Sequence, residues 1–451
     1  MISTCTLQLH ADGAWHDVAS VSLIGAGGRA ESAGYQAKTL SGYGVEWAFA
    51  HAGARDARAL CSQWPVSFET LELPHWPVCL IDMLPQGFGR QELLRRIGMR
   101  ATAGASADWP MLLAGAGNSI GNLRVKEAAA YLATNTGAVR GFTDDEVAQR
   151  GDEFAEYMAS YGLFVAGSSG VQGEWPKVLL TRAHDGLLYL DHTLPDDKAV
   201  AHYIVKFGRG ADLQLAKILR HEATYMALTA HLGLRVNAPL QLRGRALFIP
   251  RFDRVVSGSA LVRLAQESIA TLTGMPGFDA VPSHDDVCCE LIRRCSNPQL
   301  EVLEYIKRDI ANLALGNKDN HARNTAVQRD FDGRIALTPL YDFAPMYLHP
   351  DGIARRIRWH DNDGGQPDWG RVLDKVCELA DQVHQQERRS GPIPLNKSVL
   401  SAGLKTMTQP LRDIAANGVV MGLELDVYEH LKPGLERLAR ELENLACTGA
   451  Q

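Results

Sequence analysis

The fold assignment depends on the stretch Asp319-Asn320-His321-Ala322-Arg323-Asn324 and on Asp342 downstream of it. Asn324 opens a strand-like run, Asp332-Gly333 provides a turn, and a second run leads to Asp342. An antiparallel hairpin of this kind would return Asp342 towards Asn324. Two carboxylates and a carboxamide could then converge on one small volume. Hard oxygen ligands of this kind suit Mg²⁺, which proteins hold with one or two carboxylates plus substrate oxygens.

The composition is that of an ordinary globular protein. The chain has 451 residues, of which 46% are hydrophobic, so it is long enough for two or three packed lobes. Its net charge of -6 and its isoelectric point near 6.2 give no excess of Lys and Arg that would track a phosphate backbone. Direct binding of nucleic acid by this chain alone is therefore not expected.

The cysteines and the N-terminus indicate a reducing, non-membrane location. Eight cysteines are scattered without a C-x-x-C pair or a paired His spacing, which argues against a zinc site and a disulfide framework. The first residues lack a basic start followed by an apolar run, and no stretch of about 18 apolar residues occurs. We expect a cytoplasmic protein without a membrane partner.

Three segments can be distinguished along the chain. Residues 1–150 begin with a hairpin around Ala11-Asp12-Gly13 and read as a β-rich subdomain with a linker. Residues 151–255 alternate a Gly/Ser loop, a hairpin, a strand that includes Lys206, and a helix from about Asp212. Residues 256–451 read as largely helical. The order indicates a nucleotide-binding β-lobe followed by a helical lobe.

Phosphoryl transfer requires a cation on the phosphates, a covering backbone loop and a group that positions the acceptor hydroxyl. Lys206 is a candidate cation, and Glu222 lies on the apolar face of the next helix, where a carboxylate needs a partner. The loop Ala166 to Gly173 can expose amide groups to anionic oxygens. Each element alone is weak, because a Gly/Ser loop is usually a turn and a strand-terminal Lys is often solvated.

Several motifs in the same order give a resemblance to the HipA family of bacterial serine/threonine kinases, toxins of type II toxin–antitoxin systems. The similar elements are Leu84 to Arg90 in the N-terminal subdomain, Ser169 to Gln172 as a phosphate loop, Arg251 to Arg254 as a hinge element, Gln266-Glu267, the catalytic loop Asp319 to Asn324, and Thr338 to Asp342. The resemblance implies an α/β (α+β) chain with a kinase-like two-lobed fold, in which a β-rich N-terminal subdomain precedes a mainly helical C-terminal lobe. It is the joint order of these matches that carries the resemblance.

The resemblance also implies roles for individual residues. Asp319 would be the catalytic base or hydroxyl positioner, and Asn324 and Asp342 would bind Mg²⁺. The expected nucleotide contacts, with ATP as cofactor, are Gly167, Ser168, Ser169, Gly170, Val171, Gln172, Lys206, Glu222, Ile249, Arg251, Phe252 and His321. His321 could act as an acid–base group or metal ligand, but an isolated His more often braces a loop by hydrogen bonds.

This sequence departs from the family pattern at several positions. Gly173-Glu174-Trp175 interrupts the phosphate loop, Pro250 stands where relatives carry Glu, and Arg323 replaces a Lys. In some relatives a loop serine is autophosphorylated, and Ser168 and Ser169 are the candidates here. The phosphate-binding role of the loop does not depend on that modification.

The resemblance implies a growth-inhibiting kinase that phosphorylates a cellular protein, with an aminoacyl-tRNA synthetase as one target class and a small helix-turn-helix antitoxin as a partner. Two other readings use the same residues. A weakened kinase fold could act by association, or the carboxylates could support a metal-dependent nuclease. The negative net charge argues mildly against the nuclease.

Overall fold

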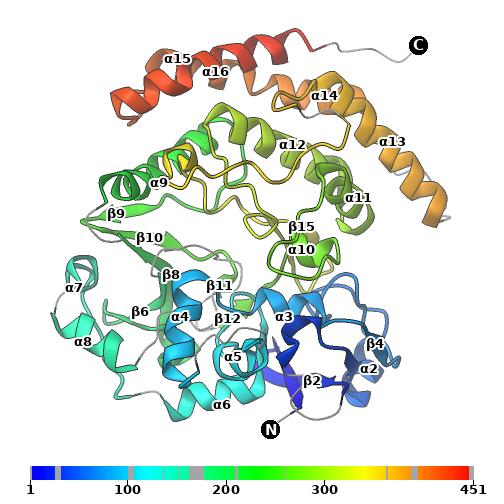
Figure 1. Cartoon of the computed structure of the whole chain (residues 1–451), viewed down its shortest axis with the longest axis vertical. Coiled ribbons are helices and arrows are strands. Elements are labelled where there is room, and N and C mark those ends of the chain that lie inside the picture. Colours follow the sequence, from blue (N-terminus) through cyan, green and yellow to red (C-terminus); the bar gives the residue numbers. More distant parts are fainter. Residues whose placement is uncertain are drawn as a thin grey trace. The chain divides into compact units, whose positions relative to one another are not determined.

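The computed structural model describes residues 3–25, 32–99, 106–135, 137–150, 152–161, 177–208, 212–257, 260–361, 364–387 and 395–445. The chain forms two compact units, and each unit is assembled from separate stretches (Figure 1). Unit 1 contains Met1–Gly210, Leu240–Ala280 and Ala326–Arg334, and unit 2 contains Ala211–Pro239, Val281–Thr325 and Ile335–Gln451. The chain therefore passes between the units several times.

The first sheet of unit 1 is antiparallel, with the strand order β4-β3-β2-β1-β5. Its strands are β1 (Thr4–Ala11), β2 (Ala14–Leu23), β3 (Thr39–Tyr43), β4 (Leu71–Leu73) and β5 (Leu123–Val125). Asp12 and Gly13 join β1 to β2 with φ angles of 50° and 76°, the left-handed pair that a two-residue hairpin turn requires. The hairpin predicted from the sequence at this position is confirmed.

Unit 1 also contains short helices. They are α2 (Val45–His51), α3 (Val78–Asp82), α4 (Gly87–Arg96), α5 (Asp108–Gly115), α6 (Lys126–Thr134), α7 (Asp144–Gln149), α8 (Asp152–Tyr161) and, later in the chain, α10 (Ile269–Leu272). The fully buried rings of Trp76 and Trp109 pack edge to face with centroids 5.2 Å apart. Such aromatic pairs stabilise a core beyond the area that they bury.

The second sheet of unit 1 has the order β7-β6-β8-β10-β9. Its strands are β6 (Lys177–Ala183), β7 (Leu188–Leu190), β8 (Ala199–Phe207), β9 (Gln241–Arg243) and β10 (Ala246–Pro250). The β6–β7 hairpin and the strand that carries Lys206 agree with the sequence prediction. Two further antiparallel pairs follow, β11 (Arg254–Ser257) with β12 (Ala260–Arg263) and β13 (Ala265–Ser268) with β14 (Ala326–Arg329).

Arg329 on β14 joins distant parts of unit 1. Its guanidinium is buried and donates hydrogen bonds to the backbone carbonyls of Arg55, Asp56, Ala59 and Leu60. One side chain therefore satisfies four carbonyl groups of a loop that forms no regular ladder. Buried carbonyls of this kind are costly when they are left without donors.

Unit 2 consists mainly of helices. They are α9 (Leu213–His231), α11 (His284–Arg294), α12 (Pro298–Ala314), α13 (Trp369–Glu387), α14 (Lys397–Lys405), α15 (Thr408–Asn417) and α16 (Leu425–Glu443), with the short strand β15 (Ile335–Leu337). Asp212 caps α9, because its Oδ1 accepts hydrogen bonds from the amides of Gln214 and Leu215 at 2.8 and 3.0 Å. The helix start predicted near Asp212 is confirmed.

Helix α9 is tied to the start of α16. The ammonium of Lys217 lies 2.6 Å from Asp426 Oδ2 and 3.0 Å from Glu424 Oε2, and Glu424 Oε1 also contacts Arg220 at 3.1 Å and His221 at 3.3 Å. The cations occupy one face of α9, and the two acids lie at the N-terminal end of α16. Negative charge is favourable there because it complements the helix dipole. We call these five residues the α9–α16 clamp.

A second polar network lies inside unit 2. Both carboxylate oxygens of Asp309 on α12 accept hydrogen bonds from Arg355 at 2.9 Å, and one also accepts from the Trp359 indole at 3.0 Å. His284 Nε2 lies 3.3 Å from Asp309 Oδ1. Although burial raises the pKa of Asp309, these neighbours hold it below its usual range. The carboxylate therefore stays charged and holds the segment 355–359 against α12.

One feature differs from the sequence interpretation. Residues 254–257, 260–263 and 265–268 form short strands before the helices begin, whereas the pattern indicated a largely helical region directly after Arg254. Helix α13 lies within the region that the sequence predicted to be largely helical. In the described part of the chain, no helix combines the length and the apolar character needed to cross a bilayer.

Candidate functional site

The loop that carries Asp319 follows α12. Gly316 ends the helix with φ +64°, a value that favours glycine. Asn317 Oδ1 accepts a hydrogen bond from the Asp319 amide at 3.3 Å, and the Asn324 amide donates to the His321 carbonyl at 2.9 Å. The residues that follow α12 thus form a tight loop, and its own side chains hold its shape.

Asn320 fixes this loop to the segment 355–357. Its Oδ1 accepts hydrogen bonds from the amides of Arg356 at 2.7 Å and Ile357 at 3.3 Å, and its Nδ2 donates to the Ile357 carbonyl at 2.8 Å. The side chain is buried. The sequence analysis did not select Asn320. Its position beside Asp319 was visible, but the carbonyl and amides that it binds are far away in the chain.

Only one of the two polar atoms of the Asn324 carboxamide forms a hydrogen bond among the described residues. Its Nδ2 donates to the Asp319 carbonyl at 2.8 Å, whereas its Oδ1 is buried and has no hydrogen-bond partner among the described residues. A buried acceptor without a donor is unfavourable unless a cation or donor completes it. An amide oxygen is also a ligand that Mg²⁺ accepts. The orphaned oxygen therefore fits the metal-binding role predicted for Asn324.

Asp342 is held beside the loop in a strained conformation. The neighbouring Tyr341 hydroxyl donates to the Arg323 carbonyl at 2.8 Å, which ties this segment to the loop. Asp342 has φ +54°, one of three positive values at non-glycine residues in the described part of the chain. Such backbone strain concentrates at functional sites. Asn324 and Asp342 together supply an amide oxygen and a carboxylate, a donor set that fits Mg²⁺.

Asp319 and His321 are the more accessible members of the loop. His321 Nε2 lies 3.7 Å from Asp319 Oδ1, and their side chains are 18% and 26% exposed. His321 Nδ1 accepts a hydrogen bond from the Arg323 amide at 3.2 Å, so in its neutral form the ring carries its proton on Nε2, towards Asp319. The contact is of the bracing kind predicted for His321. Asp319 remains open enough to meet a substrate.

Lys206 and Glu222 are both buried, at 2% and 4% exposure, on β8 of unit 1 and α9 of unit 2. Glu222 therefore does not reach water. Burial also excludes a solvated Lys206. Buried charges of this kind require partners. Their roles towards a nucleotide stay predictions.

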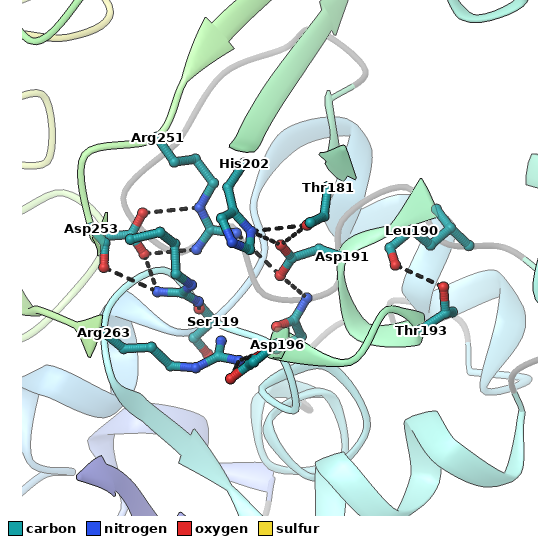
Figure 2. Close-up of polar contacts among 12 residues, drawn as sticks. Ser119, Thr181, Leu190, Asp191, Thr193, Asp196, His202, Arg251, Asp253 and Arg263 are labelled. Carbon is teal, nitrogen blue, oxygen red and sulfur yellow. Dashed lines mark hydrogen bonds and ion pairs between the residues drawn. The ribbon is translucent and has the colours of Figure 1, made fainter. Parts of the chain in front are cut away.

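The segment predicted to line the adenine pocket lies next to a buried ionic cluster in unit 1 (Figure 2). Arg251 Nε and Nη2 donate to the two oxygens of Asp253 at 2.9 and 2.7 Å, and Nη1 lies 3.2 Å from Asp191 Oδ2. The Arg251 amide donates to the His202 carbonyl at 2.9 Å. The Arg251 side chain is thus committed to structure. Nucleotide contacts by the backbone of Ile249, Arg251 and Phe252 stay predictions.

Charge balance keeps this cluster ionised. Burial alone would raise the pKa of Asp191, but the Arg251 guanidinium and the bond with His202 hold it well below its usual range. The pKa of Asp253 is lowered in the same way by Arg251 and Arg254, against the effect of burial. The Gly121 amide donates to Asp253 Oδ2 at 2.8 Å. Asp253 of the hinge element therefore also holds the segment that precedes β5.

Other motif residues are architectural. Glu267 Oε2 accepts a hydrogen bond from the Ser62 amide at 2.9 Å, and Asp82 accepts from the Ser268 amide and hydroxyl at 3.0 and 2.8 Å. All of these contacts lie within unit 1, between its first hundred residues and the β13–α10 region. The predicted phosphate-loop residues Gly167, Ser168, Ser169, Gly170, Val171 and Gln172 lie outside the described residues.

Known proteins match this chain in part of its sequence. The family model "HipA-like C-terminal domain" matches residues 169–391. A Sinorhizobium fredii protein named "Putative kinase Y4mE" is 35% identical over 142 residues, which cover 29% of this chain and 33% of that protein. The match thus spans about a third of the length of this curated relative.

The fold as a whole matches a solved HipA structure. HipA from Shewanella oneidensis, determined in a complex with HipB and operator DNA, aligns with a TM-score of 0.62 and 17% identity over 99% of this chain and 100% of that chain. This likeness shows the fold. The chain is a mixed α/β protein with a kinase-like fold, and its residues 169–391 match the model of the HipA-like C-terminal domain.

Proposed function

We propose that this chain is an ATP- and Mg²⁺-dependent protein kinase of HipA type that phosphorylates a serine or threonine of another protein. The observation that carries the proposal is the Asn324 Oδ1 atom, buried and without a hydrogen-bond partner among the described residues, in the loop that also holds Asp319. Tyr341 ties Asp342, with its positive φ, to the same loop. Metal-assisted phosphoryl transfer requires metal ligands and a group that positions the acceptor hydroxyl, and these residues can supply both.

In this mechanism Asn324 and Asp342 would hold Mg²⁺, which neutralises charge on the phosphates when it is bound. Asp319 receives a hydrogen bond from the acceptor hydroxyl and takes its proton. The hydroxyl oxygen bonds to the γ-phosphorus as the bond to the ADP oxygen breaks. His321, braced by the Arg323 amide, keeps its proton on Nε2 towards Asp319 and stabilises its ionised form.

The nucleotide itself would be bound by other parts of the chain. Lys206 and Glu222 are proposed nucleotide-binding residues, with Lys206 as the cation for the phosphates. The backbone of Ile249 to Phe252 would line the adenine pocket, and Gly167 to Gln172 would cover the phosphates, with Ser168 or Ser169 as autophosphorylation sites. Support comes from the burial of Lys206 and Glu222 and from the order of the motifs.

The biological role is part of the same proposal. We propose a growth-inhibiting toxin in the cytoplasm, held in check by a small helix-turn-helix antitoxin. The S. oneidensis protein of like fold was determined with HipB and operator DNA, which supports a partner of that class. An aminoacyl-tRNA synthetase is a candidate substrate.

The test combines nucleotide binding with phosphotransfer. The purified chain is expected to gain thermal stability from ATP only when Mg²⁺ is present, and to lose that gain in Asn324→Ala and Asp342→Ala. Asp319→Ala should still bind Mg²⁺ and ATP but should lose transfer from radiolabelled ATP by about 10²-fold or more. Asp351→Ala is the matched control, because this carboxylate is 77% exposed.

Other outcomes would favour other functions. If ATP gives no magnesium-dependent stabilisation and Asp319→Ala leaves transfer unchanged, the kinase proposal fails. Cleavage of plasmid DNA without ATP, lost in Asp342→Ala, would indicate a nuclease. Growth inhibition that survives both substitutions would indicate action by association.

A further inference from the structure

The first sheet of unit 1 has a polar face opposite the face that forms the core. Leu7 and Leu9 of β1 are buried in that core. Gln8 and His10 alternate with them along the strand. Successive side chains of a strand point to opposite sides of the sheet, so both polar residues lie on the second face. Arg124 of β5 is paired with Gln8 across the strands and shares this face.

The Arg124 guanidinium is held in position by two neighbours. Its Nε donates a hydrogen bond to Gln8 Oε1 at 2.8 Å, and Gln8 Nε2 in turn donates to Asp17 Oδ1 at 2.7 Å. The guanidinium carbon lies 3.9 Å from the centroid of the Trp15 ring on β2. The electron-rich face of an indole attracts a cation placed over it. The two terminal nitrogens of Arg124, Nη1 and Nη2, donate to no described residue.

The positive charge of Arg124 forms no ion pair among the described residues. Burial and the nearby Arg263 lower the pKa of Arg124 to about 10, and Asp17 offsets only part of that effect. Asp17 is itself paired with Lys126, whose ammonium lies 2.6 Å from Asp17 Oδ2. In the described part of unit 1, Arg124 therefore lacks a carboxylate of its own.

Arg263 of β12 is a second cation at the same ring. Its guanidinium carbon lies 5.4 Å from the centroid of Trp15. Its Nη2 donates to both oxygens of Asp196 at 2.7 and 3.0 Å (Figure 2). Its Nε is buried and has no hydrogen-bond partner in the described part of the chain, and the side chain is only 10% exposed. A buried donor without an acceptor is unfavourable, so an added acceptor would be stabilising here.

We propose that Arg124, Arg263 and Trp15 form a carboxylate-binding site on the polar face of the first sheet. The two terminal nitrogens of Arg124 would donate to the two carboxylate oxygens, while Trp15 and Gln8 hold the guanidinium plane. Arg263 adds positive charge and an unused donor beside the same ring. A guanidinium suits this task because it binds a carboxylate through two parallel hydrogen bonds.

The neighbouring charges favour a carboxylate over a phosphate. Asp17 and Asp196 border the site, and they would repel a phosphate group of nearly two negative charges more strongly than a single carboxylate. Arg124 is partly exposed, and β5 lies at the edge of the sheet. A ligand can therefore reach the site from solvent. The inference goes beyond the proposed function and does not depend on it.

The test follows the Trp15 indole N–H resonance of the full chain by NMR, assigned by its loss in Trp15→Phe. Titration with N-acetylglutamate amide should shift this resonance, whereas the uncharged N-acetylglutamine amide should not. Arg124→Ala should weaken binding of the glutamate derivative by about tenfold. Arg124→Lys should weaken it by a similar factor, because an ammonium keeps the charge but lacks the planar pair of donors.

Arg140→Ala is the matched control. Arg140 also lies over an aromatic ring, 5.1 Å from the centroid of Phe142, but it is already paired with Glu153. Its replacement should leave binding unchanged. Thermal unfolding checks that each variant is folded, and Arg124→Lys decides the matter if the alanine variant is not.

Further titrations identify the source of the carboxylate. Tighter binding of a peptide with several glutamates than of the single derivative would assign the site to an acidic protein segment, and equal affinities would assign it to a small carboxylic acid. Tighter binding of inorganic phosphate would overturn the carboxylate assignment. An equal shift with the glutamine derivative, or an unchanged affinity in the folded Arg124 variants, would overturn the site itself.

Discussion

Asp342 has a left-handed backbone, which glycine adopts without steric cost. We predict that Asp342→Gly is more stable than Asp342→Ala by about 1 kcal/mol, because both lack the carboxylate and only alanine strains the backbone. Both variants should be inactive. Chemical denaturation and the phosphotransfer assay measure the two effects.

Asp12 provides the matched control, because it has φ +50° in the β1–β2 turn, far from the loop in sequence. Asp12→Gly should again be more stable than Asp12→Ala, but both should retain activity. Equal stability of the glycine and alanine variants at position 342 would contradict the strain argument.

Asn320 is expected to be the most sensitive neutral side chain of the loop. Asn320→Ala removes three hydrogen bonds and leaves buried backbone groups unpaired, so the free energy of unfolding should fall by about 2 to 3 kcal/mol. Asn135→Ala, which removes an exposed bond to the Tyr131 carbonyl, should cost less than about 1 kcal/mol. Similar losses for both variants would mean that Asn320 does not hold the loop.

The single residues also show how far the sequence could be interpreted. Asn324 and Asp342 could be proposed as a pair because their spacing around a strand and turn is visible in the sequence, and their role stays a prediction. Asn320 could not, because its hydrogen-bond partners lie on an irregular segment. For Arg251 the motif with Asp253 was visible, but the second buried carboxylate that engages its side chain, Asp191, lies elsewhere in the chain.

Among the helices, α9 is the element whose position bears most on the proposed site, because it carries Glu222. We predict that Glu424→Gln weakens the α9–α16 clamp and speeds amide hydrogen exchange in the first turns of α9. The loss in the free energy of unfolding should stay below about 1 kcal/mol, because the Glu424 side chain is 42% exposed and solvent screens the pairs.

Glu429→Gln on the same helix is the control, since Glu429 is exposed. It should leave exchange in α9 unchanged. High salt should reduce the difference between wild type and Glu424→Gln. Unchanged exchange in the Glu424→Gln protein would show that packing alone positions α9.

The helices and hairpins were predicted where local signals were strong. Asp212 at a helix start and Asp12-Gly13 as a turn each determine the backbone through neighbouring residues. The strands between Arg254 and Ser268 were not predicted, because each has four residues and depends on pairing. β13, for example, pairs with β14, which follows much later in the chain.

At the scale of the whole molecule, each unit holds a buried ionic cluster among its described residues, around Asp253 in unit 1 and around Asp309 in unit 2. The pKa of each carboxyl is lowered in the folded state, so the folded protein binds fewer protons than the unfolded chain in acid. Their stabilisation is complete above the unfolded value, about pH 4, and is lost as the pH falls below it. Unfolding free energies measured across this range should decline steeply.

Asp253→Asn and Asp309→Asn should each flatten this decline. Each should also cost about 3 to 5 kcal/mol at pH 7, because the partner arginine is left buried without its countercharge. Hydrogen exchange should report the weakening in unit 1 for Asp253→Asn and in unit 2 for Asp309→Asn. An unaltered acid profile in both variants would contradict the assignment of these carboxylates.

Arg329 determines when unit 1 can complete its folding during synthesis. Its hydrogen-bond acceptors at Arg55 and Leu60 precede it by 274 and 269 residues. On the ribosome, the loop that contains them must wait for its donor until most of the chain has been synthesised. A nascent chain that stops short of Arg329 would carry an unfinished unit 1, open to proteases and chaperones, and translation itself would then limit how early the protein can act.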